Sequence, residues 1–511
     1  MKAGDVTIRI PRLANVCPPG SPSLRLALVV LSIGAASHFL LFLDSVVDNL
    51  LPAAMPFFLS VYRNKEDAEM AWEVMISSRI YGLAAGCLIS MLISQKSGRK
   101  IPVVIGTILD VIGIALTLLT TYVPSGVIFA IFGRFINGVG QGIVQTVGSA
   151  MLAELPPLKK RGTALASLTM WACVGELGGM FISLDDILGK PATWQLAMGV
   201  PLLFLIPALY ILLKAPESPR YLYLTNREFE ARKAMSYYQN PSDGKQSLEE
   251  IMGEAQILLK DKCIDENGNA SKVEKSEKFV LKTIVQRLKD GQFSRPLIIA
   301  LFVQSFVHLD DWLWISYSTH IFENNGLSAG KAQRASLLMS LPQAIISVAL
   351  LGFFDNFRRR TLLIIPTMFS VAFGAVAIFF TSFSSASPFG IPTALILPIL
   401  AALDLSVAAI SGESAYAIVP ELFLPNDKVL GTAMVGITQN IFGGLLTNFL
   451  LTAVNKIGTA KVLVPFVMMN AIYVLFTYNF LPETGEKTPQ EVARNFSNDM
   501  PGLDSLSLLN L

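Results

Sequence analysis

The sequence has little charge. Only 15% of its 511 residues are Asp, Glu, Lys or Arg, and 52% are hydrophobic, with a mean hydropathy of +0.53. Ordinary soluble chains carry about 25% charged residues. The charges that are present fall between apolar runs of about 20 residues, the length that crosses the hydrocarbon core of a bilayer as a helix. This pattern excludes an ordinary soluble protein and predicts an all-α membrane protein whose surroundings are the lipid bilayer.

Motifs for other chemistry are also missing. The four cysteines, at positions 17, 87, 173 and 263, show no metal-ligand spacing and suggest no disulfide framework. The sequence has no phosphate-cradling loop of the Walker type and no nucleophile motif beyond chance. We therefore expect neither an enzyme nor a metal site, no cofactor and no nucleic-acid partner, and any transport must draw on a gradient.

The apolar runs predict about twelve spans, six on each side of a long polar segment. The expected organisation is a cytoplasmic N-terminal segment (1–24), a first six-helix bundle (25–215), a linker with short helices (216–294), a second bundle (295–481) and a tail (482–511). Residues 1–23 lack the hydrophobic core and cleavage site of a removable signal peptide, so the first span is expected to direct targeting.

Basic residues indicate the orientation. Lysine and arginine gather in alternate connections, at 95–100, 159–161, after Pro216 and at 358–360, whereas 120–125 and 382–388 carry none. The positive-inside rule places the basic loops, and hence both termini, in the cytoplasm. Charged residues recur at matching connections in both halves, which is typical of a duplicated six-helix bundle surrounding a central path.

Three motifs resemble the sequence signatures of a known protein family. Glu154, Pro157, Arg161 and Gly162 reproduce the spacing Glu-x-x-Pro-x-x-x-Arg-Gly, with Arg134 earlier in the same apolar run. The blocks 216–220 (Pro-Glu-Ser-Pro-Arg) and 482–488 (Pro-Glu-Thr-Gly-Glu-Lys-Thr) follow in order. The chain thereby resembles the sugar porters of the major facilitator superfamily, which include the facilitative glucose transporters. The resemblance implies the major facilitator fold, a small polar solute, alternating access and, by default, the plasma membrane.

The first span has one polar side. Asp44 lies on it with Ser37, His38, Ser45 and Asp48, opposite an apolar side. A carboxylate at mid-membrane is costly unless it is paired, protonated or hydrated. By resemblance to proton-coupled porters, Asp44 is the candidate proton-coupling site; a structural pair with a basic or hydroxyl group is the alternative.

The fifth span repeats this pattern, because Thr169, Cys173 and Glu176 share a helical face. Thr169 stands where sugar porters usually have a sugar-binding glutamine, and its hydroxyl can still bond a polyol. Gln145 in the fourth span, with Gln439 and Asn440 in the eleventh, offers further hydrogen bonds to hydroxyls.

The seventh and tenth spans depart furthest from the sugar porters. His308, Asp310, Asp311 and Trp312 replace the amide-rich sugar motif. A histidine three residues from an acid is placed to relay protons, or simply to form a satisfied structural pair. Tyr416 stands in place of a tryptophan that lines the sugar site, in a segment that lacks the family's two prolines. These residues complete the expected substrate site.

The resemblance also implies a cytoplasmic gate made of ion pairs that join the bundles in the outward-facing state and break when the inside opens. The residues at the corresponding positions are Arg99, Arg134, Glu154, Arg161, Glu217, Arg220, Arg358, Arg359, Glu421 and Lys428.

The sequence therefore predicts a transporter for a hexose or related sugar, either facilitative or proton-coupled. Its surplus of membrane acids, including Asp310, Asp311 and Glu413, favours protons or a cationic solute, so an organic-cation carrier of the same superfamily is the first alternative. Loss of the sugar-binding amides leaves a non-transporting sugar sensor as the second.

Overall fold

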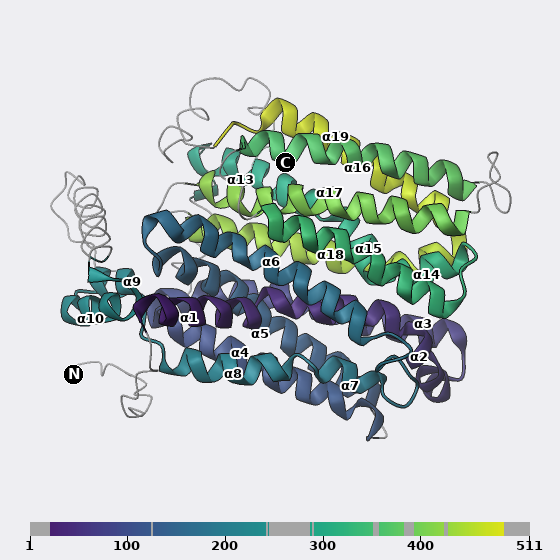
Figure 1. Ribbon diagram of the computed structural model, residues 1–511, viewed down its shortest axis with the longest axis horizontal. Coiled ribbons are helices and arrows are strands. Elements are labelled where there is room, and N and C mark those ends of the chain that lie inside the picture. The colour runs from purple at the N-terminus through teal and green to yellow at the C-terminus, as the bar shows by residue number, and fades with distance from the viewer. Residues whose placement is uncertain are drawn as a thin grey trace.

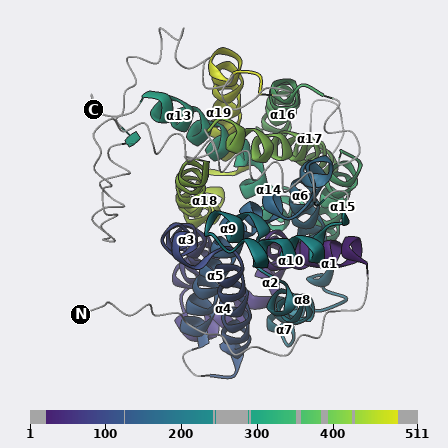
Figure 2. The same ribbon diagram turned by 90° about the vertical axis from the view of Figure 1, so that its left-hand side faces the viewer.

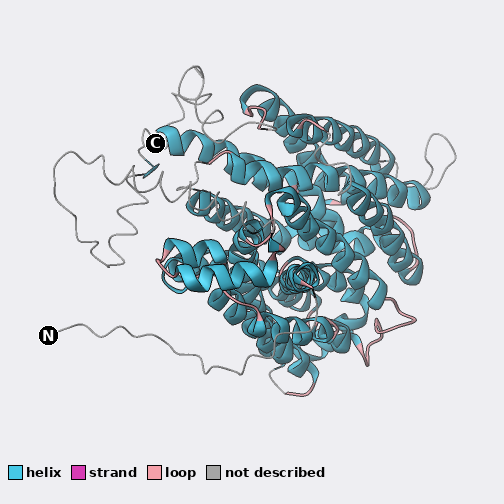
Figure 3. Cartoon of the chain, turned by 60° about the vertical axis from the view of Figure 1, so that its left-hand side comes forward, coloured by secondary structure: helices cyan, strands magenta, loops and turns pink. Residues whose placement is uncertain are grey.

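The computed structural model describes residues 21–123, 126–241, 244, 287–288, 291–350, 357–382, 393–423 and 428–484. Most of the expected linker and the tail from 485 lie outside this description. So do the side chains of Arg161 and Lys428. Within the described residues the chain is helical, without strands (Figure 3).

Ten helical segments are long and apolar enough to cross a membrane. Two further helices, α6 and α15, run alongside them, so the described helices make twelve lengthwise passes, which agrees with the expected number of spans. The helices of the first half are α1 (Pro22–Ala36), α2 (Phe42–Tyr62), α3 (Lys65–Ser97), α4 (Lys100–Leu118), α5 (Gly126–Glu154), α6 (Leu158–Ile182), α7 (Trp194–Gly199) and α8 (Leu202–Lys214).

The second half begins after the linker and contains α13 (Gly291–Val307), α14 (Leu309–Asn324), α15 (Ala329–Leu350), α16 (Arg359–Ser382), α17 (Thr393–Glu421), α18 (Lys428–Ile457) and α19 (Thr459–Phe480). The two halves lie side by side as two bundles, purple to blue and green to yellow (Figures 1 and 2). Two short helices, α9 (Pro219–Leu224) and α10 (Glu228–Tyr238), lie at one end of the bundles, here called the linker end.

Small residues bring α3 and α5 into backbone contact. A Cβ atom on Gly138 would lie 2.0 Å from the carbonyl oxygen of Arg79, and one on Gly142 would lie 2.3 Å from that of Leu83. Glycines four apart allow this approach between membrane helices, where close packing replaces the hydrophobic driving force of water. Gly138 and Gly142 therefore allow the close approach of α3 and α5.

The first span is broken, which the sequence did not predict. After α1 the backbone leaves the helical region at Ser37 (φ −121°, ψ −87°), forms a 3₁₀ turn, η1 (His38–Leu41), and re-enters a helix at Phe42. A break inside a membrane frees carbonyl groups that must find partners within the protein. Gln141 donates to the Ser37 carbonyl at 2.9 Å, and Arg79 donates to the Leu40 carbonyl at 2.6 Å.

Polar contacts join the bundles at the end opposite the linker end. On α2, Asp48 accepts hydrogen bonds from the Ser318 hydroxyl at 2.8 Å and from the Thr319 backbone N–H at 3.0 Å. Gln333 on α15 donates to the Asn49 carbonyl at 2.9 Å. Asp48 is 2% exposed, so it lies in a closed contact between bundles.

A second seam runs between α3 and α18. Glu73 accepts from the Thr452 backbone N–H at 2.8 Å, and one turn further along, Ser77 donates to Asn448 at 3.0 Å. These pairs and the Asp48 contacts form what we call the closing seam. The two bundles are therefore fastened together at the end away from α9 and α10.

Candidate functional site

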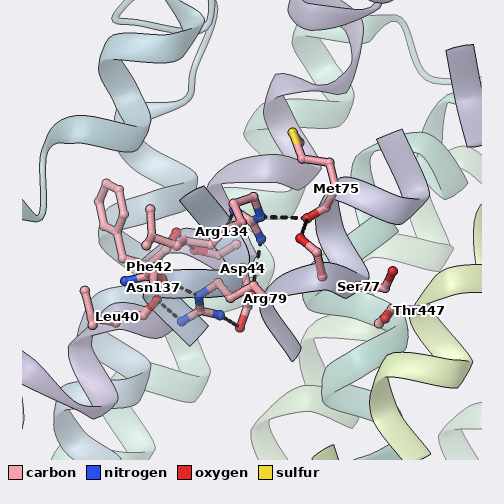
Figure 4. A network of polar contacts seen from close by, with 12 residues as sticks. Leu40, Phe42, Asp44, Met75, Ser77, Arg79, Arg134, Asn137 and Thr447 are labelled. Atoms are coloured by element: carbon pink, nitrogen blue, oxygen red, sulfur yellow. Dashed lines mark hydrogen bonds and ion pairs between the residues drawn. The ribbon is translucent and has the colours of Figure 1, made fainter. Parts of the chain in front are cut away.

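Asp44 lies between two buried arginines in the first bundle. Arg79 on α3 forms an ion pair with one carboxylate oxygen, and the Arg134 Nη2 atom on α5 lies 3.6 Å from the other. The side chains of Arg79 and Arg134 are 0% and 2% exposed, whereas that of Asp44 is 16% exposed. Figure 4 shows both guanidinium groups turned toward the carboxylate. Asp44 is thus a paired acid, and whether it is also a proton-coupling site stays a prediction.

The same arginines hold backbone and amide groups. Arg134 donates to the carbonyls of Leu43 and Met75, each at 3.0 Å. Arg79 donates through Nε to Asn137 at 3.0 Å, and Asn137 donates to Asp110 at 3.0 Å. The network therefore joins α2, α3, α4 and α5 through polar side chains, of which all but Asp44 are buried. Buried polar groups stabilise a structure when they have partners.

Arg134 does not belong to a gate at the linker end. It lies on the same helix as Glu154 but 20 residues earlier, and at 1.5 Å per residue the two Cα atoms are about 30 Å apart. Its partners are Asp44, Leu43 and Met75. The sequence-based assignment of Arg134 to the gate is wrong, because the assignment rested on a shared helix and a shared motif rather than on depth in the membrane.

A second polar group lies where the seventh span breaks between α13 and α14. His308 occupies this break, and its Nδ1 atom lies 2.7 Å from Asp311 Oδ2. The ring of Tyr416 on α17 lies next to both His308 and His38, with centroid separations of 5.3 and 5.9 Å. Since His38 lies in η1, the two broken spans meet around Tyr416 at the boundary between the bundles.

Carboxylates from both bundles flank α15. Gln343 donates to Glu176 of α6 at 3.0 Å, and four residues later Ser347 donates to Glu413 of α17. Glu176, Gln343 and Glu413 are each at most 7% exposed. Glu176, Glu413 and Asp311 all act electrostatically on Cys173 of α6. The structure thus brings Glu176, His308, Asp311 and Tyr416 of the expected substrate site to one region.

Two of the predicted residues lie apart from it. Asp310 accepts hydrogen bonds from Ser370 at 2.8 Å and from Asn470 at 2.8 and 3.0 Å, inside the second bundle. Trp312 lies against α18, where a Cβ atom on Gly443 would overlap its ring. Asp310 is therefore bonded inside its own bundle, and Trp312 is a partly exposed side chain that packs against α18. Their role in binding stays a prediction.

The remaining predicted residues supply hydrogen-bonding groups along the helices. Gln145 lies on α5 one turn after Gln141, and Thr169 on α6 two turns before Glu176; both are partly exposed. Gln439 and Asn440 on α18 are 8% exposed, and Asn440 lies 3.9 Å from the sulfur of Cys87 on α3. Their role in binding stays a prediction.

Residues 28–496 match the family model described as "Sugar (and other) transporter". The chain belongs to this sugar transporter family. It is accordingly an integral, multi-pass membrane transporter and not an enzyme.

Curated relatives agree with this membership. The human solute carrier family 2, facilitated glucose transporter member 9 is 24% identical over 444 residues, covering 84% of this chain and 76% of the relative. Human member 4 is 26% identical over 438 residues, covering 83% and 77%. An Arabidopsis thaliana protein called "Probable inositol transporter 3" is 26% identical over 308 residues, covering 58% of this chain and 49% of the relative.

Solved structures establish the fold of this sugar transporter. The proton:xylose symporter XylE bound to 6-bromo-6-deoxy-D-glucose superposes with a TM-score of 0.70 at 16% identity, over 93% of this chain and all of the other. A partially occluded inward-open form of XylE from E. coli gives 0.69 at 18%, over 92% and 100%. The predicted major facilitator fold is confirmed.

The charged residues near the linker end pair within single bundles. Arg99 lies 3.2 Å from Glu154, and Glu217 accepts from the backbone N–H groups of Arg99 and Lys100 at 2.9 and 3.1 Å. In the second bundle, Arg359 pairs with Glu421. Each of these described pairs lies within one bundle, whereas the contacts of the closing seam join the two bundles. Of the other expected gate residues, Arg220 lies on α9 and Arg358 is exposed.

Sequence reasoning missed Arg79, Asn137 and Gln343. The available signal for Arg79 was a single arginine inside an otherwise apolar run, since ionisable groups within a membrane are functional candidates by default. Asn137 and Gln343 are uncharged and carry no such signal, because an amide in a membrane helix also serves ordinary helix association.

Proposed function

We propose that this protein carries a hexose or related polyol across a membrane by alternating access. The observation that carries the proposal is the contrast between the two ends of the bundles. At one end Asp48 and Glu73 fasten the bundles together, while at the linker end the described ion pairs remain within one bundle. A transporter that rocks two bundles about a central site has one end fastened at a time.

The basic loops favour a cytoplasmic linker end, with both termini in the cytoplasm and the plasma membrane as the family default. In that orientation the closing seam faces outward. The structure is then an outward-closed conformation, and transport requires that the Asp48 and Glu73 contacts break and re-form in each cycle.

The site around Tyr416 suits a hydroxyl-bearing solute. Its ring offers an apolar face, which favours stacking against a sugar ring. Gln145, Thr169, Gln439 and Asn440 supply donors and acceptors for hydroxyl groups. The names of the relatives include glucose and inositol, and both compounds fit this description.

A cationic solute is the second candidate, and Glu176 and Glu413 favour it. Each has one side-chain hydrogen bond from α15, and in the described part of the chain neither forms an ion pair. One oxygen of Glu413 and the carbonyl oxygen of Gln343 are buried without a hydrogen bond. Buried carboxylates without a counter-charge are costly, and an ammonium group on the solute would supply that charge.

Binding can be tested on the purified protein by its thermal stability. A ligand at a hundred times its Kd adds about 2.7 kcal/mol to stability. We expect glucose, fructose or myo-inositol to raise the melting temperature of the wild type and of Tyr210→Ala, an exposed control on α8, but not of Tyr416→Ala.

Choline tests the second candidate in the same assay. Stabilisation by choline alone, lost in Glu176→Gln or Glu413→Gln, would replace the sugar proposal with the cationic one. Stabilisation of Tyr416→Ala by the same sugar would remove Tyr416 from the site.

A further inference from the structure

Arg79 makes more contacts than a simple ion pair requires. Its side chain is 0% exposed. Its guanidinium group forms an ion pair with Asp44 and donates hydrogen bonds to the Leu40 carbonyl, Asn137 and Gln141. Figure 4 shows it beside the break in the first span, with Asp44 on one side and Asn137 on the other. The guanidinium fork matches this arrangement, which a lysine ammonium could not satisfy in the same way.

Asp44 meets more than one positive charge. Arg79 forms an ion pair with it, and the Arg134 Nη2 atom lies 3.6 Å from its other oxygen. Asp110 joins the network only through Asn137, and one of its oxygens is buried without a hydrogen bond. Arginine keeps its charge in proteins. Removing Arg79 would leave Asp44 with a single, more distant counter-charge, in a region where a poorly compensated charge is expensive.

The surrounding elements add few titratable groups. Tyr317 of α14 interacts electrostatically with Arg134, and Glu176 of α6 interacts with Asp44. His38 in η1 bonds through Nδ1 with Ser37 and faces Tyr416 instead. The direct partners of Asp44 are therefore the two arginines of its own bundle.

We propose that Arg79 is a built-in counter-cation for Asp44. Arg79 supplies permanently the positive charge that a carried proton would otherwise bring to Asp44. Asp44 is then compensated in every state of the cycle, because α2, α3 and α5 belong to one bundle and move together. Transport by this chain consequently does not draw on a proton gradient. Arg79 acts as a positioning residue, through Asp44 and the broken first span.

The first test does not require a known solute. Infrared difference spectra between neutral and mildly acidic buffer report carboxyl groups that gain a proton. We expect Arg79→Gln to show one protonated-carboxyl band that is absent from the wild type and from the double variant Arg79→Gln/Asp44→Asn. Arg79→Lys keeps the charge and should resemble the wild type, which separates loss of charge from loss of shape.

Two outcomes would overturn the proposal. One is an Asp44-dependent band of equal size in the wild type. The other is an extra band in Arg79→Gln that survives Asp44→Asn and disappears with Asp110→Asn, because the carboxyl group that gains the proton would then be that of Asp110. A spectrum of Arg79→Gln identical to that of the wild type would also count against it, provided that size-exclusion profiles show folded protein.

The second test rests on the proposed transport function. A one-unit inward pH gradient can drive up to about tenfold accumulation when one proton accompanies each solute. We expect no such accumulation for the wild type or for Arg232→Gln, an exposed arginine paired with Glu228 on α10, and gradient-driven accumulation for Arg79→Gln. Failure of all variants to take up sugar would count against the transport proposal, while the infrared result would still decide the role of Arg79.

Discussion

Neutralising Asp44 alone is expected to lower the free energy of unfolding by about 3–5 kcal/mol, the usual cost of removing one partner from a buried ion pair. Asp44→Asn leaves Arg79 and Arg134 without their shared acid, and neither side chain reaches solvent. Thermal unfolding of the purified protein measures the loss. The control is Glu228→Gln, which removes an exposed pair with Arg232 and should cost at most about 1 kcal/mol.

A second substitution should restore part of this loss. Arg79→Gln/Asp44→Asn removes both charges of this ion pair, so neither charge is left without the other. The double variant should therefore be more stable than the sum of the two single losses predicts, with a coupling energy of about 0.5–3 kcal/mol. Strict additivity would show that Asp44 and Arg79 do not stabilise each other as the structure indicates.

Gly443→Ala is expected to destabilise the contact between α14 and α18. A Cβ atom there would lie 0.6 Å from Cζ3 of the Trp312 ring, so the indole must leave its place against α18. Over-packing of this kind costs about 1–3 kcal/mol and sometimes more. The melting temperature and the yield of monodisperse protein should both fall.

Two variants make this expectation specific. Gly436→Ala on the same helix meets only the Cys87 sulfur at 3.5 Å, an ordinary contact, and should be tolerated. Trp312→Ala removes the obstructing ring, so Gly443→Ala should cost little in that background. Equal losses from Gly443→Ala with and without Trp312 would mean that the ring is not what the added methyl group meets.

The sequence predicted the long elements well, because a bilayer imposes length and hydropathy directly. It could not predict the break at Ser37. Residues 37–41, which form the break, contain no glycine or proline, and the freed carbonyls accept hydrogen bonds from Arg79 and Gln141 on other helices. Breaks of this kind depend on tertiary partners and leave little local signal.

The sequence also did not give the depth of a residue in the membrane or the helix that its side chain contacts. Arg134 and Glu154 share a helix and a family motif, yet their distance along that helix excludes a common network. Asp310 and Asp311 are neighbours whose side chains point about 100° apart on a helix. Asp311 reaches His308, whereas Asp310 turns to Ser370 and Asn470. Spacing gives the face of a helix but not the element that it meets.

We propose that this chain carries sugar by alternating access without proton coupling. The most direct test is uptake of labelled glucose and fructose by proteoliposomes containing the purified protein, with and without an inward proton gradient. The structure predicts saturable uptake of at least one sugar at the same rate in both conditions. Uptake only with the gradient would contradict the role assigned to Arg79, and no uptake by demonstrably folded protein would contradict the sugar proposal itself.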